Sequence, residues 1–250
     1  DPVDRTAAAS QPQEPTRPSA MRPRPERQVW QPATSGQALR SDGEAVIAAR
    51  EAAAAAGDLD ALKAAIEAFD GCALKKTASN TVVFDGTPRS PLLVIGEAPG
   101  AEEDRRGLPF VGPAGQMLDR MLAAIGIDRQ SNALISNILF WRPPGNRSPN
   151  DAEIGACLPF VEKLIELSAA RYLLLVGGPS AKTLLAKSEG VLKLRGRWFH
   201  YQNEFLPQPL PALVTLHPAY LLRQPAQKRL AWRDLLALKR AIEAGADPAA

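Results

Sequence analysis

Three polar segments of the chain each follow an apolar run, and they carry residue types that could bind and activate a ligand. Residues 96–104 combine glycines with carboxylates, and the small residues of 107–115 follow them. A second segment contains Asn137, and a third begins at His217. Small residues let backbone N–H groups approach a ligand, Asn supplies one acceptor and two donors, and His changes charge near neutral pH. Such a set suits the recognition of an amide-like base edge.

Each segment also has a simpler interpretation. Residues 96–104 match neither G-x-G-x-x-G nor G-x-x-x-x-G-K-[ST], and their acids argue against a phosphate-binding loop. A single Asn near a strand end more often satisfies local backbone groups, and a His there is more often structural. Asn137 and His217 become site candidates because each is expected to face the other polar segments.

A repeated strand–helix pattern places these segments. Apolar runs predict strands at 81–86, 91–96, 132–141, 171–178 and 211–216, and helical spacing predicts helices at 43–57, 58–69, 114–127, 150–167, 179–186 and 227–244. Strands this apolar indicate an α/β fold whose parallel sheet is covered by helices on both faces. Ligands bind at the carboxyl ends of such strands, so the loops after Ile95, Phe140, Val176 and Leu216 should form the site.

Two local details accompany this pattern. Asn150 stands where a helix N-cap is expected, because Asn accepts hydrogen bonds from the first free backbone N–H groups of a helix. The strand-like residues 197–202 are expected to form a hairpin with the chain that follows them.

Composition limits the class of protein. The 250 residues are 45% hydrophobic, which suits one sizeable core. Two cysteines and two histidines exclude a disulfide framework and leave little for a metal site. The sequence contains no apolar run long enough to span a membrane and no apolar signal-peptide core at its start. We expect a cytoplasmic monomer without a membrane partner.

The first 42 residues differ from the rest of the chain. They hold seven of the 23 prolines and lack any apolar period, so residues 1–42 are expected to form a disordered Pro/Arg-rich tail or linker. A solvated spacer and an arm that tethers DNA or a partner are both compatible with this composition. We expect one catalytic domain over residues 43–245 and a flexible C-terminus over 246–250.

Taken in order, these motifs resemble the bacterial family 4 uracil-DNA glycosylases. The resemblance rests on GEAPG with the acids that follow it, GLPFVGPAG, SN followed by RPPGNR, and HPAYLLR, and it spans roughly residues 69–243. It implies a three-layer sandwich with a central four-stranded parallel sheet flanked by helices. It also implies excision of uracil, and of other deaminated bases if discrimination is loose, as the first step of base excision repair.

The resemblance assigns roles to the motif residues. Phe110 would stack on the flipped base, Asn137 would read the amide edge of uracil, and His217 would face O2 as negative charge develops there. Uracil would leave first, and water would then attack the sugar.

Water activation is the least defined role. Glu97 is the first candidate because Ala98 stands where better-known uracil glycosylases place an Asp, and Glu103 and Asp104 form a reserve acid network. Ala98 and Gly100 would line the base site. Gly100 would leave room that a bulky aromatic uses to reject the methyl group of thymine.

The cysteines depart from the family pattern. Typical members hold a 4Fe–4S cluster with four cysteines, whereas Cys72 and Cys157 match the second and fourth positions, and Phe69 and Trp141 stand at the other two. Two thiolates are too few for such a cluster, so we expect no cofactor and an apolar filling of the vacated volume. Free thiols are favoured over a Cys72–Cys157 disulfide in a reducing compartment.

A relative of this family traps the abasic sugar covalently with a His in an inserted basic loop. The corresponding residues, 187–197, contain no His, and His200 lies further on in a strand-like stretch. Turnover is therefore expected rather than covalent trapping.

Local charge indicates a DNA substrate more clearly than the net charge of +3. Residues 217–240 carry six basic side chains and one acid. The expected DNA contacts are Arg142, Arg147, Tyr220, Leu221 and Arg223, with the apolar residues of 220–222 as a wedge into the duplex. Single- and double-stranded DNA both remain open as substrates.

Two other functions compete with the glycosylase. One is a non-catalytic or cross-linking module that binds damaged bases, and the other is a hydrolase of small nucleotides. Formation of abasic sites would separate the enzyme from the module, and activity on free deoxyuridine would identify the hydrolase.

Overall fold

The computed structural model describes residues 35–249, with side chains from Gly43 onward. Residues 1–34 of the expected tail lie outside this range, and helix α1 is described from Ser35 to Ala55. At the other end, the Tyr172 hydroxyl donates a 2.8 Å hydrogen bond to the Ala246 carbonyl, so the segment after the last helix contacts the domain.

A six-stranded sheet lies at the centre, in the order β1-β3-β2-β4-β6-β5. Strands β3, β2, β4 and β6 are parallel neighbours, which confirms the expected four-stranded parallel centre. Strands β1 and β5 add antiparallel edges, and β5 forms the expected hairpin with β6. The strands are β1 (Phe84–Gly86), β2 (Leu92–Gly96), β3 (Ala133–Asn137), β4 (Tyr172–Val176), β5 (Trp198–Tyr201) and β6 (Leu210–Thr215).

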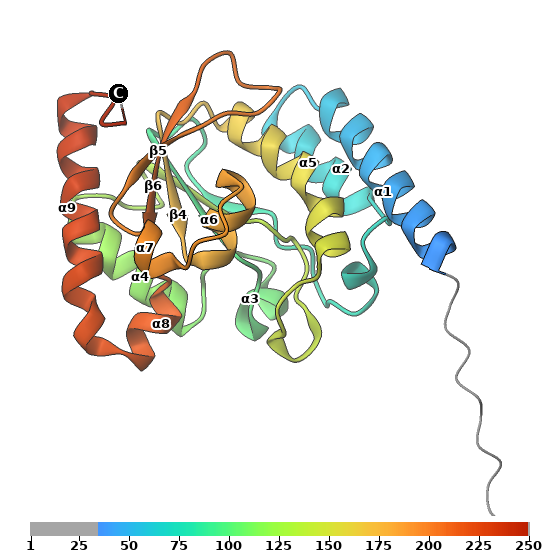
Figure 1. The fold of residues 1–250 in the computed structure, drawn as a ribbon, viewed down its shortest axis with the longest axis horizontal. Coiled ribbons are helices and arrows are strands. Elements are labelled where there is room, and N and C mark those ends of the chain that lie inside the picture. Colours follow the sequence, from blue (N-terminus) through green and yellow to red (C-terminus); the bar gives the residue numbers. More distant parts are fainter. Residues whose placement is uncertain (1–34, 250) are drawn as a thin grey trace, which may run out of the picture.

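Helices cover both faces of this sheet, giving the expected three layers (Figure 1). The longer helices are α1, α2 (Leu59–Ala68), α4 (Pro113–Ala123), α5 (Asp151–Ser168), α6 (Gly178–Leu185) and α9 (Lys228–Ala244). The short helices are η1 (Ala73–Lys76), α3 (Ala101–Arg106), η2 (Pro144–Asn146), α7 (Val191–Leu194), α8 (Pro218–Arg223) and η3 (Pro225–Gln227).

Alternate residues of the buried strands build two separate cores. Leu93 and Ile95 of β2 pack with α1, α2, α5 and α6, whereas Leu92 and Val94 pack with α4, α8 and α9. Strand residues alternate between faces, so a strand covered on both sides must be apolar throughout. This explains why the strands appear as continuous apolar runs in the sequence.

The strand expected at 132–141 ends earlier, at Asn137. The Ile138 N–H donates to the Gly96 carbonyl (3.0 Å) and the Leu139 N–H to that of Glu97 (3.1 Å), so the chain continues along the loop that leaves β2. Asn137 therefore stands at the carboxyl edge of the sheet, where a ligand would bind.

Two further features concern the helices of the described chain. Asn150 caps α5, as predicted, because its side chain accepts the Glu153 N–H at 2.8 Å. Within residues 35–249, no helix is both long and apolar enough to cross a membrane.

Candidate active site

A pocket of about 470 Å³ opens at the carboxyl edge of the sheet. Its lining comes from all three polar segments, because parallel strands deliver their following loops to the same edge. The residues that line it are Glu97, Ala98, Pro99, Gly100, Glu103, Phe110, Ala114, Asn137, Pro143, Asn146, Arg147, Ser148, His217, Ala219, Tyr220 and Arg223.

Asn137 forms part of the floor of this pocket. Its side chain is 1% exposed, and its Oδ1 has no hydrogen-bond partner among the described residues. A buried amide oxygen without a partner is costly, so such an atom needs a particular explanation. Here the pocket provides one: a ligand that donates a hydrogen bond would satisfy this oxygen.

Phe110 contributes an aromatic wall. Its ring centroid lies 5.7 Å from that of His217, with an angle of 34° between the rings. The close approach requires glycine at position 96, since a Cβ there would lie 2.4 Å from Phe110 Cζ and 2.5 Å from Asn137 Oδ1. The end of β2 thus makes room for both groups.

His217 is the N-cap residue of α8. Its Nδ1 accepts the Ala219 N–H at 3.2 Å, so in the neutral ring the proton is on Nε2. Burial lowers the His217 pKa to about 4, with a further lowering by Arg223 and an opposing effect of Glu103. His217 is therefore a neutral hydrogen-bond donor at physiological pH rather than a cation.

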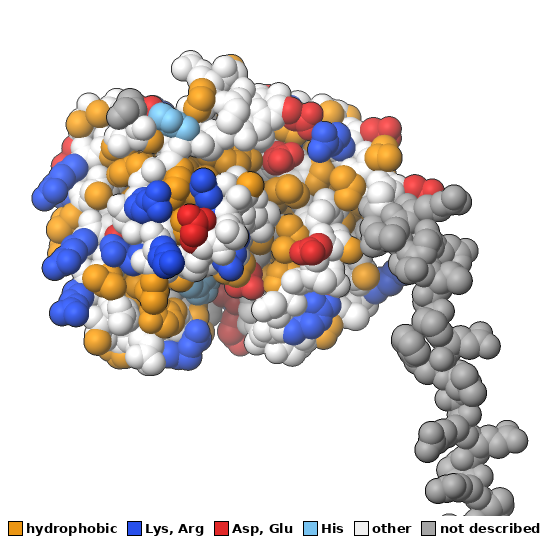
Figure 2. Space-filling view, viewed as in Figure 1, with side chains coloured by type: hydrophobic (Ala, Val, Ile, Leu, Met, Phe, Trp, Pro, Cys, Tyr) orange, Lys and Arg blue, Asp and Glu red, His pale blue; other side chains and the backbone are white. Residues whose placement is uncertain are grey.

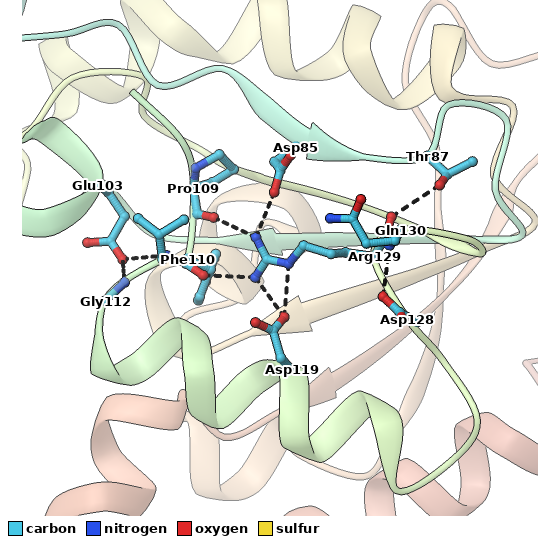
Figure 3. Close-up of polar contacts among 11 residues, drawn as sticks. Asp85, Thr87, Glu103, Pro109, Phe110, Gly112, Asp119, Asp128, Arg129 and Gln130 are labelled. Atoms are coloured by element: carbon cyan, nitrogen blue, oxygen red, sulfur yellow. Dashed lines mark hydrogen bonds and ion pairs between the residues drawn. The ribbon is translucent and has the colours of Figure 1, made fainter. Parts of the chain in front are cut away.

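Glu97 and Glu103 both line the pocket, but their surroundings differ. Burial raises the pKa of Glu97. Glu103 Oε2 accepts the Gly100 N–H (3.1 Å), and its Oε1 accepts those of Val111 (2.9 Å) and Gly112 (2.8 Å; Figure 3). Glu103 therefore joins the two small-residue loops.

The other residues of this loop that were expected at the site differ in their positions. Asp104 is outside the pocket lining, and its carboxylate accepts the backbone N–H groups of Ser79 (2.8 Å) and Asn80 (3.2 Å). Ala98 and Gly100 do line the pocket. A Cβ on Gly100 would lie 2.7 Å from Glu103 Oε2, so a larger residue at this position would require that carboxylate to move.

The expected DNA-contacting residues divide into two groups. Arg147, Tyr220 and Arg223 lie at the pocket, although Arg147 also forms a two-pronged ion pair with Glu153. Arg142 does not line the pocket and donates to Asn146 Oδ1 at 2.8 Å.

The expected wedge residue Leu221 points into the core. It is 1% exposed, whereas the neighbouring Leu222 is 41% exposed. Helix α8 turns by about 100° per residue, so the side chains of two adjacent leucines point in different directions, one toward the core and the other toward solvent. Leu222, rather than Leu221, is therefore the leucine of this helix that is exposed to solvent.

The basic C-terminal segment forms an exposed positive surface. Figure 2 shows lysine and arginine side chains gathered over the part of the molecule that contains α7 and α9. The one acid of residues 217–240, Asp234, is buried, where it pairs with Arg195 and accepts the Thr215 hydroxyl at 2.8 Å. The acid therefore does not offset the exposed positive charge.

The residues at the cluster positions do not fit a 4Fe–4S group. Cys72 and Cys157 are free, buried thiols, and burial raises the pKa of Cys157. Phe69 packs edge-on against Phe160 at a centroid distance of 5.1 Å, and Trp141 Nε1 donates to Thr81 Oγ1 at 3.0 Å. Aromatic side chains with their own partners replace two of the four sulfur ligands, and two thiolates are too few for the cluster.

His200 is a residue of β5, as expected, and lies outside the pocket lining. Its Nε2 lies 2.9 Å from the Asp247 carboxylate.

Sequence reasoning missed several residues that shape the pocket. Gly177 has a φ of 103°, and a Cβ there would lie 3.2 Å from His217 Cβ. Gly177 is the first of two glycines between an apolar run and the helix predicted at 179–186, so its position was a usable signal. Arg129 supports the pocket wall from behind, but it stands in an ordinary turn sequence without a recognisable motif.

Fold and pocket together define a class: an α/β protein whose pocket, at the carboxyl edge of a parallel sheet, combines an aromatic wall, a buried amide and an imidazole. The profile of the uracil DNA glycosylase superfamily matches residues 83–236, and this chain belongs to that superfamily. The resemblance inferred from the motifs is thereby confirmed.

Several similar proteins share most of their length with this chain. The type-4 uracil-DNA glycosylase of Pyrobaculum aerophilum is 36% identical over 182 residues, covering 71% of this chain and 91% of the relative. That of Saccharolobus solfataricus is 33% identical, covering 74% and 87%, respectively. The bacterial protein of the same description from Thermotoga maritima is 32% identical, covering 66% and 84%.

Proposed function

We propose that this protein is a uracil-DNA glycosylase that flips uracil out of DNA and hydrolyses its bond to deoxyribose. One observation carries the proposal: the unpartnered Oδ1 of buried Asn137 lies in a pocket that also presents Phe110 and neutral His217. Uracil offers a planar ring, an N3–H donor and two carbonyl acceptors. Membership of the superfamily and the type-4 relatives support this assignment.

Phe110, Asn137 and His217 each have one task in this reaction. The Phe110 ring stacks on the extruded base, while Asn137 accepts from N3–H through Oδ1 and donates to O4 through Nδ2. The C1′–N1 bond breaks with its electron pair passing to uracil, and negative charge develops on O2. Nε2–H of His217 donates to this oxygen, and a neutral donor suits this task because it needs no proton from solvent.

The sugar cation that remains is attacked by water. The water oxygen forms the new bond to C1′, and its proton passes to a base. Glu97 is the group proposed for this role, because its carboxylate lines the pocket and is not engaged by the loop N–H groups that Glu103 accepts. The exposed positive surface of the C-terminal segment, residues 217–240, holds the phosphates, with Leu222 at the gap that the flipped base leaves.

The decisive test is uracil release from matched oligonucleotides. We expect abasic sites, revealed as alkali-sensitive breaks, in uracil-containing DNA and none in the matched thymine-containing control. Assays with hypoxanthine, xanthine and mismatched thymine would define the base range. Binding without strand breaks would instead support the damage-binding module, and release from free deoxyuridine alone would support a nucleotide hydrolase.

The acid side of the pH–rate profile should identify Glu97. Its carboxylate must be ionised to accept a proton, and burial raises its pKa above the ordinary value of 4.5, so activity should fall as pH drops through that raised pKa. In Glu97→Gln the residual rate should be about 10²–10⁴-fold lower. Its remaining acid limb should move down to about pH 4, where His217 becomes protonated. An unchanged acid limb in Glu97→Gln would assign the base elsewhere.

We also propose that the enzyme works without a 4Fe–4S cluster. Phe69 and Trp141 fill the core beside Cys72 and Cys157, and large aromatic side chains contribute strongly to core stability. Anaerobically purified protein should hold far less than one iron atom per chain while remaining active. The Phe69→Cys/Trp141→Cys double variant, which restores four cysteines, is the positive control for iron uptake. Near-stoichiometric iron in the unaltered protein would disprove this proposal.

We propose that the protein acts on DNA as a monomer in the cytoplasm. Each role proposed above is assigned to a residue of this one chain, so the proposed reaction needs no residue of a partner. Light scattering of the free protein and its DNA complex would test the oligomeric state.

A further inference from the structure

The aromatic wall of the pocket depends on an unusual backbone conformation. Phe110 has a φ of 54°, in the left-handed region that residues with a side chain rarely adopt. A residue stays there only when its surroundings over-determine the conformation. The groups that hold the Phe110 backbone therefore control where the stacking surface lies.

Arg129 holds that backbone from the side opposite the pocket. Its Nη2 donates to the Phe110 carbonyl at 2.8 Å, and its Nη1 to the Pro109 carbonyl at 3.0 Å (Figure 3). Two acids orient the guanidinium, with Asp119 accepting from Nε (2.9 Å) and Nη2 (2.7 Å) and Asp85 from Nη1 (2.9 Å). Every N–H donor of the side chain is used.

The same segment is fixed from its other side. Glu103 accepts the N–H groups of Val111 and Gly112, while Arg129 donates to the two carbonyls just before them. Gly115, in the first turn of α4, permits this path, because a Cβ there would lie 1.8 Å from the Phe110 carbonyl oxygen. A cation and an anion thus hold successive peptide groups in one orientation.

The contacts of Arg129 do more than stabilise the fold through an ion pair. The Asp119 side chain is 47% exposed and the Asp85 side chain 25%, so both acids reach partly into solvent, where ion pairs contribute less to stability than fully buried ones. The residue itself is only 8% exposed, and its own carbonyl accepts the Thr87 hydroxyl at 3.1 Å. A residue whose backbone is held by Thr87 and whose guanidinium is directed at two carbonyls is suited to fixing a backbone.

We infer that Arg129 is a positioning residue for base recognition, which acts through the Phe110 backbone without touching the substrate. This inference rests on the proposed glycosylase function. Lysine should not replace Arg129, because a single ammonium group cannot contact two carbonyls and two carboxylates in the fixed fork geometry of guanidinium. The loss should appear as weaker binding of the flipped base rather than of DNA.

A double-mutant cycle between Arg129 and Phe110 tests the inference. Misplacement of a contact by about 1 Å can lower the rate about 10²-fold, so Arg129→Met should reduce kcat/KM for uracil release by about that factor. Phe110→Ala should have a comparable effect. Both changes remove the same stacking surface. Adding Arg129→Met to Phe110→Ala should therefore lower kcat/KM little further.

Two controls separate positioning from loss of stability. Arg129→Met should raise the inhibition constant of free uracil while leaving the affinity for uracil-free DNA unchanged. Tyr172→Phe removes the buried hydroxyl bond to the Ala241 carbonyl, away from the pocket lining, and should lower the unfolding temperature without changing either value. If Arg129→Met does not fold, Arg129→Lys takes its place in the cycle.

The outcomes are distinct. Independent, multiplicative losses in the cycle, or an unchanged inhibition constant for uracil, would overturn the positioning role even when the unaltered enzyme is active. Failure of the unaltered protein to release uracil would instead contradict the proposed function.

Discussion

Replacement of Asn137 by alanine is expected to lower kcat/KM for uracil release by about 10³-fold while leaving the fold intact. The side chain would make two hydrogen bonds to the base, and loss of one well-placed donor at a developing charge already costs about 10²–10³-fold. In the free protein the Oδ1 of Asn137 has no partner among the described residues, so its removal should cost the fold little. Single-turnover assays and thermal unfolding measure the two effects.

Asn203 provides the opposite control. Its side chain accepts the N–H groups of Phe205 (2.9 Å) and Leu206 (3.0 Å) and lies outside the pocket lining. Asn203→Ala should lower the free energy of unfolding by about 1–3 kcal/mol and leave the rate unchanged. If Asn137→Ala proved strongly unstable but fully active, Asn137 would be a structural residue and the proposed base contact would be wrong.

Replacement of His217 by alanine should reduce kcat by about 10²–10³-fold, because the donor to uracil O2 is lost in the transition state. The effect should appear mainly in kcat, since negative charge on O2 is fully developed only as the bond breaks. The rate of the unaltered enzyme should not require a protonated His217, whose pKa is lowered to about 4. Protonation below that pH would remove the acceptor for the Ala219 N–H.

The second histidine is the matched control for this variant. His200 lies on β5 and outside the pocket, so His200→Ala should keep the full rate. A His217→Ala variant with an unchanged kcat would show that the charge on O2 is stabilised by other groups.

The sequence was sufficient to predict that the main pocket residues lie together at one edge of the sheet. Asn137 ends the apolar strand β3 and His217 follows the apolar strand β6, and the carboxyl ends of parallel strands meet at one edge. The family resemblance added Phe110, whose importance no periodicity would have revealed. The two antiparallel edge strands were also predicted in part: β1 lies within the strand expected at 81–86, and β5 lies within the stretch expected to form a hairpin.

Other features depended on tertiary contacts that no local pattern carries. Arg129 and Phe110 are 19 residues apart and meet through a side chain and a carbonyl, so neither residue type indicates the pair. Glu103 was assigned to a reserve acid network because its loop is acidic, yet it binds three backbone N–H groups. Leu221 and Leu222 are identical in type, and only the rotation of a six-residue helix decides which one is exposed.

The two sides of the pocket differ in how freely they could evolve. Glycine is required at positions 96 and 115 by contacts with Phe110, so most single substitutions there would disrupt the aromatic wall. On the other side, Asn146 and Ser148 are exposed residues of a short loop that also borders the pocket. A library directed at this loop, rather than at the aromatic wall, offers the natural starting point for engineering an enzyme with a changed preference for damaged bases.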